Sequence, residues 1–420
     1  MLKGGALLYA ITISLIIALI CLSLILLSSF IQLQTTQYRE LDRLRLNSTS
    51  GINLLLSQYE IPKNKRVQID LFGNNTDSVE LYKNHWGVFD LISSRAFWRG
   101  NNFVQAAIEG YELEESERFA LYLADNDKSL SVCGKTVISG KSYLPKAGVK
   151  RAYIEGQYFA GDKLINGEIL ESKKAVPPLD KELIQRLSAD YRNYSPLEEP
   201  KKAAELYAVD SVSNSFSKET LVFYATGNIE LDNQFISGNI IIISDEAIEV
   251  GSGTKLYDVI LTAPKIIFNE TFHGSCQAIA SEEIEIKNNC IFDYPSTVAI
   301  CYEGTTGTLP LINIGEGSKI NGVVVSTYAS VPITSSSRSK IIVEKNAQIH
   351  GQVYSSSSVD LKGSIYGSLI CGNIVLTTPS SVYENHLLNA TVDISKLSRY
   401  YTGINTADIY SSKRIIKWLY

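Results

Sequence analysis

The longest uninterrupted apolar run lies near the start of the chain. Residues 6–31 carry no charge, and their only polar side chains are the hydroxyls of Thr12, Ser14, Ser23, Ser28 and Ser29. A helix of this length rises about 39 Å, more than the hydrocarbon core of about 30 Å that it would cross. The pattern therefore predicts a transmembrane helix over 6–31, preceded by a short leader or cytoplasmic tail at 1–5.

Two processing signals are the alternatives to a permanent anchor. A cleaved secretory signal has an apolar core of about 7 to 15 residues and small residues before the cut. A cut after Ser29 would put Leu27 at the third position before it. Cys21 follows Leu19 and Ile20 rather than the small residues of a lipoprotein signal. Both observations favour the anchor.

Residues at steps of three and four after the anchor predict an amphipathic stem helix over 32–61. The stripe consists of Tyr38, Leu41, Leu44, Ser48, Ile52, Leu55 and Tyr59. Pro62 ends the helix, because proline lacks a backbone donor and disfavours helical angles in the preceding residue. The Ser-Thr-Ser-Gly run at 48–51 is a second point where the helix could break.

Short alternating strands and turn residues predict a β-rich region over 62–176. A glycine-bounded strand at 134–140 resembles in spacing the repeat that follows it. Residues 177–200 begin with two prolines and predict a linker helix. Its charged residues Asp180, Lys181, Glu182 and Arg186 are expected to face solvent.

Pairs of apolar residues two apart recur at a spacing near eighteen from about residue 229 to 382. The pairs are Ile248/Val250, Ile266/Phe268, Ile284/Ile286, Ile341/Val343 and Val359/Leu361. Longer intervals around Ile312 are explained by loops at 303–309 and 331–339. Gly274, Gly322, Gly351 and Gly367 each follow an apolar residue by two positions and are expected at tight corners.

This spacing predicts a parallel β-helix of roughly eight coils over 201–392, with capping strands in 393–420. The alternative, an antiparallel sandwich, also has short spaced strands, but the regular pairs and the scarcity of Asn-Gly hairpin turns favour the β-helix. The predicted fold class is mainly β.

Charge and composition exclude several functions. The net charge is −5, with 39 basic and 44 acidic residues and no basic run, which argues against nucleic-acid binding. The four histidines, His85, His273, His350 and His386, show no metal-ligand spacing. Asp258, Lys265, Glu282, Glu285 and Lys287 could line an enzymatic β-helix face, but solvated coil edges explain them more simply. We therefore expect no catalytic residue, no metal and no cofactor.

The six cysteines are dispersed, and Cys21 lies in the predicted anchor. Cys276, Cys290 and Cys301 are close enough in sequence for one disulfide between adjacent coils. The alternative is that they are buried thiols stacked in the β-helix core.

The opening residues Lys3-Gly4-Gly5-Ala6-Leu7-Leu8-Tyr9-Ala10 resemble the start of type IV pilin-like proteins. The resemblance implies cleavage by a prepilin peptidase between Gly5 and Ala6, and an anchor helix that continues outward onto a globular head. The family's usual glutamate at the fifth mature position is replaced here by Ala10, as in minor pilins and tip pseudopilins that lack it.

The C-terminal repeat resembles the β-helices of bactofilins and of adhesins, and three functional hypotheses follow. The first is a non-enzymatic, single-pass envelope protein of the bacterial cytoplasmic (inner) membrane, with its bulk outside, acting as a pilin-like, structural or adhesion component. Its partners would be the membrane and other proteins of an envelope or pilus-like assembly. The second is a membrane-tethered polymer-forming scaffold, and the third is a β-helix that binds or cleaves surface glycan.

Overall fold

The computed structural model describes residues 3–73, 77–188, 200–302, 309–329, 339–406 and 412–419. The chain is mainly β and divides into two compact units. The first comprises Met1–Lys83 and Ile92–Gln105, and the second comprises Asn84–Leu91 and Ala106–Leu419. The predicted fold class, a long N-terminal helix followed by β structure with parallel strands, is confirmed.

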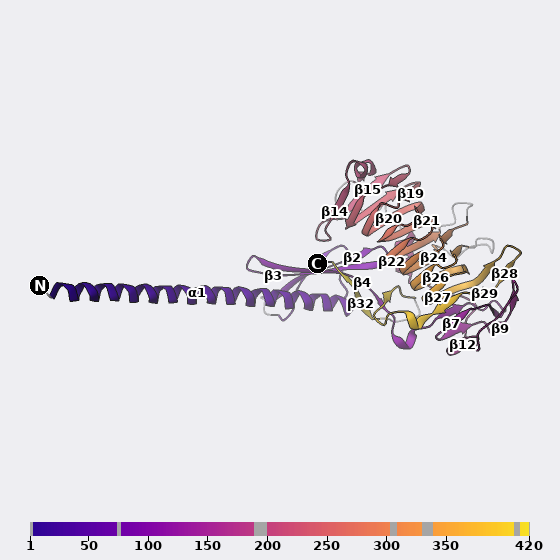
Figure 1. The fold of residues 1–420 in the computed structure, drawn as a ribbon, viewed down its shortest axis with the longest axis horizontal. Helices are drawn as coiled ribbons and strands as arrows, with labels where there is room; N and C mark the ends of the chain where they lie inside the picture. The colour runs from indigo at the N-terminus through magenta and orange to yellow at the C-terminus, as the bar shows by residue number, and fades with distance from the viewer. Residues whose placement is uncertain are drawn as a thin grey trace. The chain divides into compact units, whose positions relative to one another are not determined.

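A single helix, α1 (Lys3–Leu56), combines the predicted anchor and stem without a break (Figure 1). The expected interruption at 48–51 was wrong, because the hydroxyls there are bonded: Ser48 donates to the carbonyl of Ser94 and Thr49 to that of Arg45. The helix ends at Leu56 rather than at 61. Gln58 takes a left-handed φ of 65°, and the Tyr59 N–H bonds back to the Leu54 carbonyl, a helix-terminating arrangement.

Four strands follow α1 and form a sheet in the order β1-β2-β3-β4. They are β1 (Arg66–Asp70), β2 (Ser78–Trp86), β3 (Phe89–Trp98) and β4 (Asn101–Glu112). Residues 107–112 of β4 also pair antiparallel with β31 (Thr402–Gly403) and β32 (Lys413–Trp418). The strands expected to cap the β-helix in 393–420 therefore belong to this sheet instead.

Most of the second unit is a parallel β-helix, in which each strand pairs with the equivalent strand of the next coil. The strands of 201–392 are β13 (Lys201–Lys202), β14 (Ser211–Asn214), β15 (Leu221–Ala225), β16 (Ile229–Leu231), β17 (Phe235–Gly238), β18 (Ile240–Ser244), β19 (Ala247–Val250), β20 (Lys255–Phe268), β21 (His273–Ile286), β22 (Ile291–Tyr302), β23 (Leu311–Ile314), β24 (Lys319–Tyr328), β25 (Lys340–Val343), β26 (Gln348–Leu361), β27 (Ser364–Thr377), β28 (Val382–Glu384), β29 (His386–Leu388) and β30 (Thr391–Asp393).

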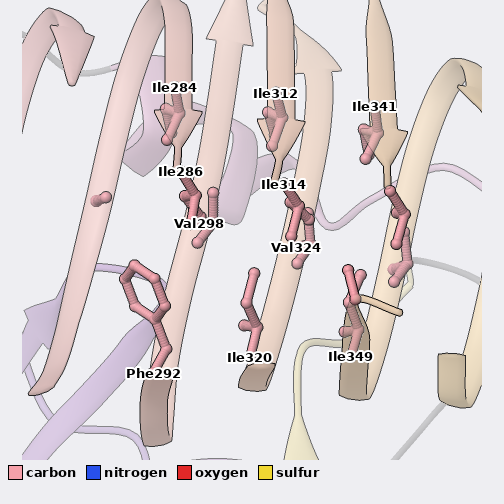
Figure 2. Close-up of a cluster of buried hydrophobic side chains, with 14 of the residues drawn as sticks. Ile284, Ile286, Phe292, Val298, Ile312, Ile314, Ile320, Val324, Ile341 and Ile349 are labelled. Carbon is pink, nitrogen blue, oxygen red and sulfur yellow. The ribbon is translucent and has the colours of Figure 1, made fainter. Parts of the chain in front are cut away.

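The predicted apolar pairs form continuous columns through this β-helix. One column runs through eight successive coils by direct pairing, and its members are Ile229, Ile248, Ile266, Ile284, Ile312, Ile341, Val359 and Ile374. All eight side chains are fully buried. Figure 2 shows Ile284, Ile312 and Ile341 of this column in line, with Ile286 and Ile314 beside them. The eighteen-residue spacing therefore corresponds to one coil, as predicted.

A second column is made of glycines at a corner of the β-helix. Gly322, Gly351 and Gly367 pair with one another in successive coils. A Cβ added to Gly351 would lie 1.8 Å from the Gly322 carbonyl oxygen, and one added to Gly367 would lie 1.8 Å from that of Gly351. Only glycine fits here, because any side chain would push adjacent coils apart.

The β-helix extends beyond the predicted 201–392 because coils from the preceding region join it. Leu121 pairs in parallel with Leu369, and Val137 pairs with Thr391. The joining strands are β5 (Leu121–Leu123), β6 (Leu130–Cys133), β7 (Val137–Ser139), β8 (Ser142–Leu144), β9 (Val149–Arg151) and β12 (Ile169–Glu171). The predicted single β-rich region over 62–176 is thus divided between the four-stranded sheet and these coils.

The remaining elements are short. They are α2 (Lys181–Ser188), the 3-10 turns η1 (Glu115–Glu117), η3 (Ala203–Ala208) and η4 (Ile394–Lys396), and the hairpin β10 (Tyr153–Ile154) with β11 (Gln157–Tyr158). The linker helix predicted over 177–200 is present as α2, and residues 189–199 lie outside the described part of the chain.

Shortening a side chain in the first column, which we call the isoleucine column because seven of its eight members are isoleucine, should destabilise the β-helix. We expect Ile312→Ala, at a fully buried site between two coils, to cost about 2–5 kcal/mol of unfolding free energy. The matched control is Ile291→Ala in β22, whose side chain is 38% exposed, for which we expect a change within about 0.5 kcal/mol. Thermal unfolding followed by circular dichroism measures both, and equal losses would contradict the stacked-core assignment.

Candidate functional site

The first half of α1 presents apolar side chains on every side. By length and composition, this helix is able to cross a membrane. The hydroxyls of Thr12, Ser14 and Ser23 each donate to a carbonyl three residues earlier in the helix, at 2.8–2.9 Å. Because these hydroxyls are satisfied internally, they need no water in an apolar environment. This half of α1 is suited to lipid.

The second half of α1 packs within the first unit. Leu44, Ser48, Ile52 and Leu55 of the predicted stripe are buried, with at most 3% exposure. A Cβ added to Gly51 would lie only 2.2 Å from the Ser94 hydroxyl oxygen, so a larger residue does not fit there without a shift of the helix or the sheet. The glycine therefore permits close contact between helix and sheet. The outer members of the stripe, Tyr38, Leu41 and Tyr59, are exposed, so the stem packs over a shorter length than predicted.

Asp77 fixes the helix to the strand that follows. Its carboxylate accepts two hydrogen bonds from Arg43 and one from Asn47, each 2.7 Å long. The Asp77 side chain is 6% exposed and that of Arg43 is 48% exposed. A bidentate pair of this kind fixes orientation as well as distance. The point where α1 leaves its exposed apolar half is thus held by charge as well as by packing.

A second group of charges lies in the other unit and is buried except for Glu182 and His85; we call it the ion cluster. It comprises Asp90 of β3, Glu109 of β4, Lys413 of β32, Glu182 and Arg186 of α2, and His85 of β2. The Lys413 ammonium lies 2.9 Å from the Asp90 carboxylate and 2.8 Å from that of Glu109. The Arg186 guanidinium lies 2.9 Å from Asp90.

His85 lies between Asp90 and Glu182 of the ion cluster. Its Nδ1 lies 3.0 Å from Asp90 and its Nε2 lies 3.0 Å from Glu182. Burial alone would lower the pKa of Lys413, but the charges of Asp90 and Glu109 outweigh it and raise that pKa above its usual value. Burial raises the pKa of the neighbouring Tyr111. Lys413 is therefore a firmly charged ammonium, suited to holding carboxylates and unsuited to accepting a proton.

The ion cluster was not predicted from the sequence. Arg186 was expected to face solvent, but its side chain is only 11% exposed. Arg186 follows the buried Leu183 by three residues and therefore lies beside the buried face of α2, where it meets Asp90 rather than water. Glu109, within the apolar stretch Ala106-Ala107-Ile108-Glu109, was the available signal, because a carboxylate in a buried strand requires a cation.

The remaining predicted residues do not converge on a site. Gly5 and Ala6 lie in the first turns of α1, and their cleavage stays a prediction. Cys276 and Cys290 are buried thiols outside any disulfide, and burial raises the pKa of both. No pair among the three cysteine candidates is therefore joined, and Cys301 is also buried.

Three residues of the candidate enzymatic face, and the histidines other than His85, have separate partners. Lys417 binds both oxygens of Asp258, Lys265 pairs with Glu283, and Lys287 donates to Asn269. His273 pairs with Asp293, His350 packs on Tyr366, and His386 contacts the Glu384 carbonyl. In the described ranges, no group of three His, Cys, Asp or Glu residues has a geometry that could hold a metal ion.

Comparison of the chain with known protein families, with curated proteins and with solved structures finds no match.

Removing the cation of the ion cluster should be costly. We expect Lys413→Met to lose about 3–5 kcal/mol of unfolding free energy, because it removes the ammonium that lies against the buried carboxylates of Asp90 and Glu109. The control is Lys417→Met on the same strand, whose lysine is 36% exposed and paired with Asp258, for which we expect at most about 1 kcal/mol.

The pH dependence supplies the second readout of the same experiment. Because the folded-state pKa of Lys413 lies above the usual lysine pKa of 10.5, its contribution to stability is fully present below pH 10.5 and is lost as pH rises through the folded-state pKa. Chemical denaturation at pH 8 and above pH 10.5 measures this. Equal losses for the two variants at pH 8 would contradict a stabilising role for the ion cluster.

Proposed function

We propose that this chain is a non-enzymatic, pilin-like subunit of the bacterial cell envelope, anchored by α1 and displaying its β-helix outside the cytoplasmic membrane. The observation that carries the proposal is the change of surroundings along one unbroken helix. Its first half is apolar and exposed, and one face of its last part, from Leu44 to Leu55, is buried against a sheet. An anchor helix that continues onto a globular head is what the resemblance of residues 3–10 implies.

The contacts within the first unit support this proposal. An ordinary tether between membrane and domain needs no fixed orientation. Here Arg43 and Asn47 bind Asp77, Ser48 binds Ser94, and Gly51 allows close approach of helix and sheet. A rigid connection suits a subunit that must hold its head at a set position relative to an assembled helix bundle, which a flexible linker would not do.

Processing of the N-terminus tests the pilin-like part of the proposal. In cells containing a prepilin peptidase, we expect the mature chain to begin at Ala6, and in cells lacking it to retain the five preceding residues. Mass spectrometry of the purified protein measures this. Gly5→Leu should block cleavage, and Gly4→Leu is the matched control that leaves the Gly5–Ala6 bond available. An unchanged N-terminus in both strains would remove the pilin-like assignment and leave the anchor.

Orientation is tested separately. Protease added to intact spheroplasts should digest the region after α1 if this region lies outside the cytoplasmic membrane. Exposed residues near the end of the packed helix, such as Tyr59, make cleavage there expected. A cytoplasmic marker protein must survive in the same sample. Digestion only after the spheroplasts are lysed would show that the β-helix faces the cytoplasm and would overturn the envelope proposal.

A further inference from the structure

The second unit contains a cavity that the proposed function does not use. It has a volume of about 420 Å³, within the range of small-molecule sites. Its lining comes from four parts of the chain: Ser116, Glu117, Phe119 and Tyr122; Tyr143; Lys173, Ala175, Val176, Pro177 and Pro178; and Thr406. The lining is mainly apolar with a few polar groups, as is usual for ligand sites.

One wall of the cavity is aromatic. Phe119 and Tyr143 meet edge to face with ring centroids 5.6 Å apart, and Tyr122 and Tyr143 lie 5.5 Å apart at 33°. Phe119 and Tyr122 are 8% and 7% exposed. The three rings therefore support one another as a fixed surface.

The segment that includes Pro177 and Pro178 is held in place across from these rings by hydrogen bonds. The Tyr122 hydroxyl donates to the Ala175 carbonyl at 3.2 Å and accepts from the Lys173 N–H at 3.0 Å. The Tyr354 hydroxyl donates to the Pro177 carbonyl at 3.0 Å. Two consecutive prolines further limit the backbone. The cavity is thus formed before any ligand enters, which lowers the entropic cost of binding.

Two polar atoms in the lining lack partners among the residues that the structure describes. They are the hydroxyl oxygen of Thr406 and the Oε2 oxygen of Glu117. Thr406 is only 6% exposed. A buried polar atom without a hydrogen bond is destabilising, by about 1–3 kcal/mol in typical proteins. A bound molecule that supplies hydrogen bonds to both would remove this cost.

We propose that this cavity binds a neutral sugar ring. A ring of this kind places C–H groups on its faces, which pack against aromatic rings, and hydroxyls on its edges, which both donate and accept. Glu117 requires a donor and Thr406 takes either role, so the hydroxyls of a sugar can bond to both. A wholly apolar ligand would leave Glu117 and Thr406 unpaired, and an anion would be repelled by the Glu117 carboxylate.

The test uses the full chain in lipid nanodiscs, so that no glycosidic detergent competes for the cavity. The probes are maltose, cellobiose, lactose and N,N′-diacetylchitobiose, and saturation-transfer NMR detects binding. We expect at least one sugar to bind, and Thr406→Val to weaken its affinity about tenfold through loss of one hydrogen bond. The same substitution should leave the thermal midpoint unchanged or higher, because it removes an unpaired buried hydroxyl.

The matched control is Thr297→Val, which removes another buried, unpartnered hydroxyl at a position outside the cavity lining. It should keep the wild-type affinity. Glu117→Gln should weaken binding as Thr406→Val does. Failure of all four sugars to bind, or wild-type affinity in Thr406→Val, would overturn the proposal. Neither result bears on the processing or orientation of the anchor, which have their own readouts.

Discussion

The fold of the second unit depends on the stacking of one coil upon the next. No coil can bury its inward side chains or satisfy its backbone alone, because the parallel pairings join each coil to its neighbours. The isoleucine column and the glycine column meet this requirement in complementary ways. The former fills the interior with β-branched side chains, and the latter keeps the backbones of adjacent coils close enough to form hydrogen bonds. Two aromatic residues of the cavity, Tyr122 and Tyr143, lie on strands of this stack, β5 and β8.

A stack of coils has two ends, and each would expose unpaired backbone groups unless something covered it. At one end, the 3-10 turn η3 buries Ala203 and Leu206 against the core. At the other, residues 121–171 supply further coils before the β-helix ends at β12. Because residues 121–171 cover this end of the β-helix, β31 and β32 are not needed there and pair with β4 instead. On β32, Lys413 lies against two buried carboxylates.

Periodicity along the sequence predicted which apolar residues stack in consecutive coils. It could not predict contacts between residues that are distant in the chain. The spacing from Ile248 to Ile266 and from Ile266 to Ile284 revealed the columns, because neighbouring coils are also neighbours in sequence. The pairing of Leu121 with Leu369 leaves no such periodic trace. Asp90, Arg186 and Lys413 likewise come from three separate segments, so only the unusual position of Glu109 hinted at their meeting. The aromatic cavity was missed for the same reason, since Thr406 lies far along the chain from Tyr122 and Tyr143.

The joining of Leu121 to Leu369 also governs the order in which the chain can fold. The two residues are about 250 positions apart, so β27, the strand that pairs with β5, is among the last to be synthesised. Until then, the edge of β5 that pairs with β27 in the native fold has no partner and is open to pairing with other chains. A chain delivered across a membrane from its N-terminus would keep that edge open for most of its passage. Its maturation should consequently benefit from a holding chaperone that shields β5 until β27 emerges.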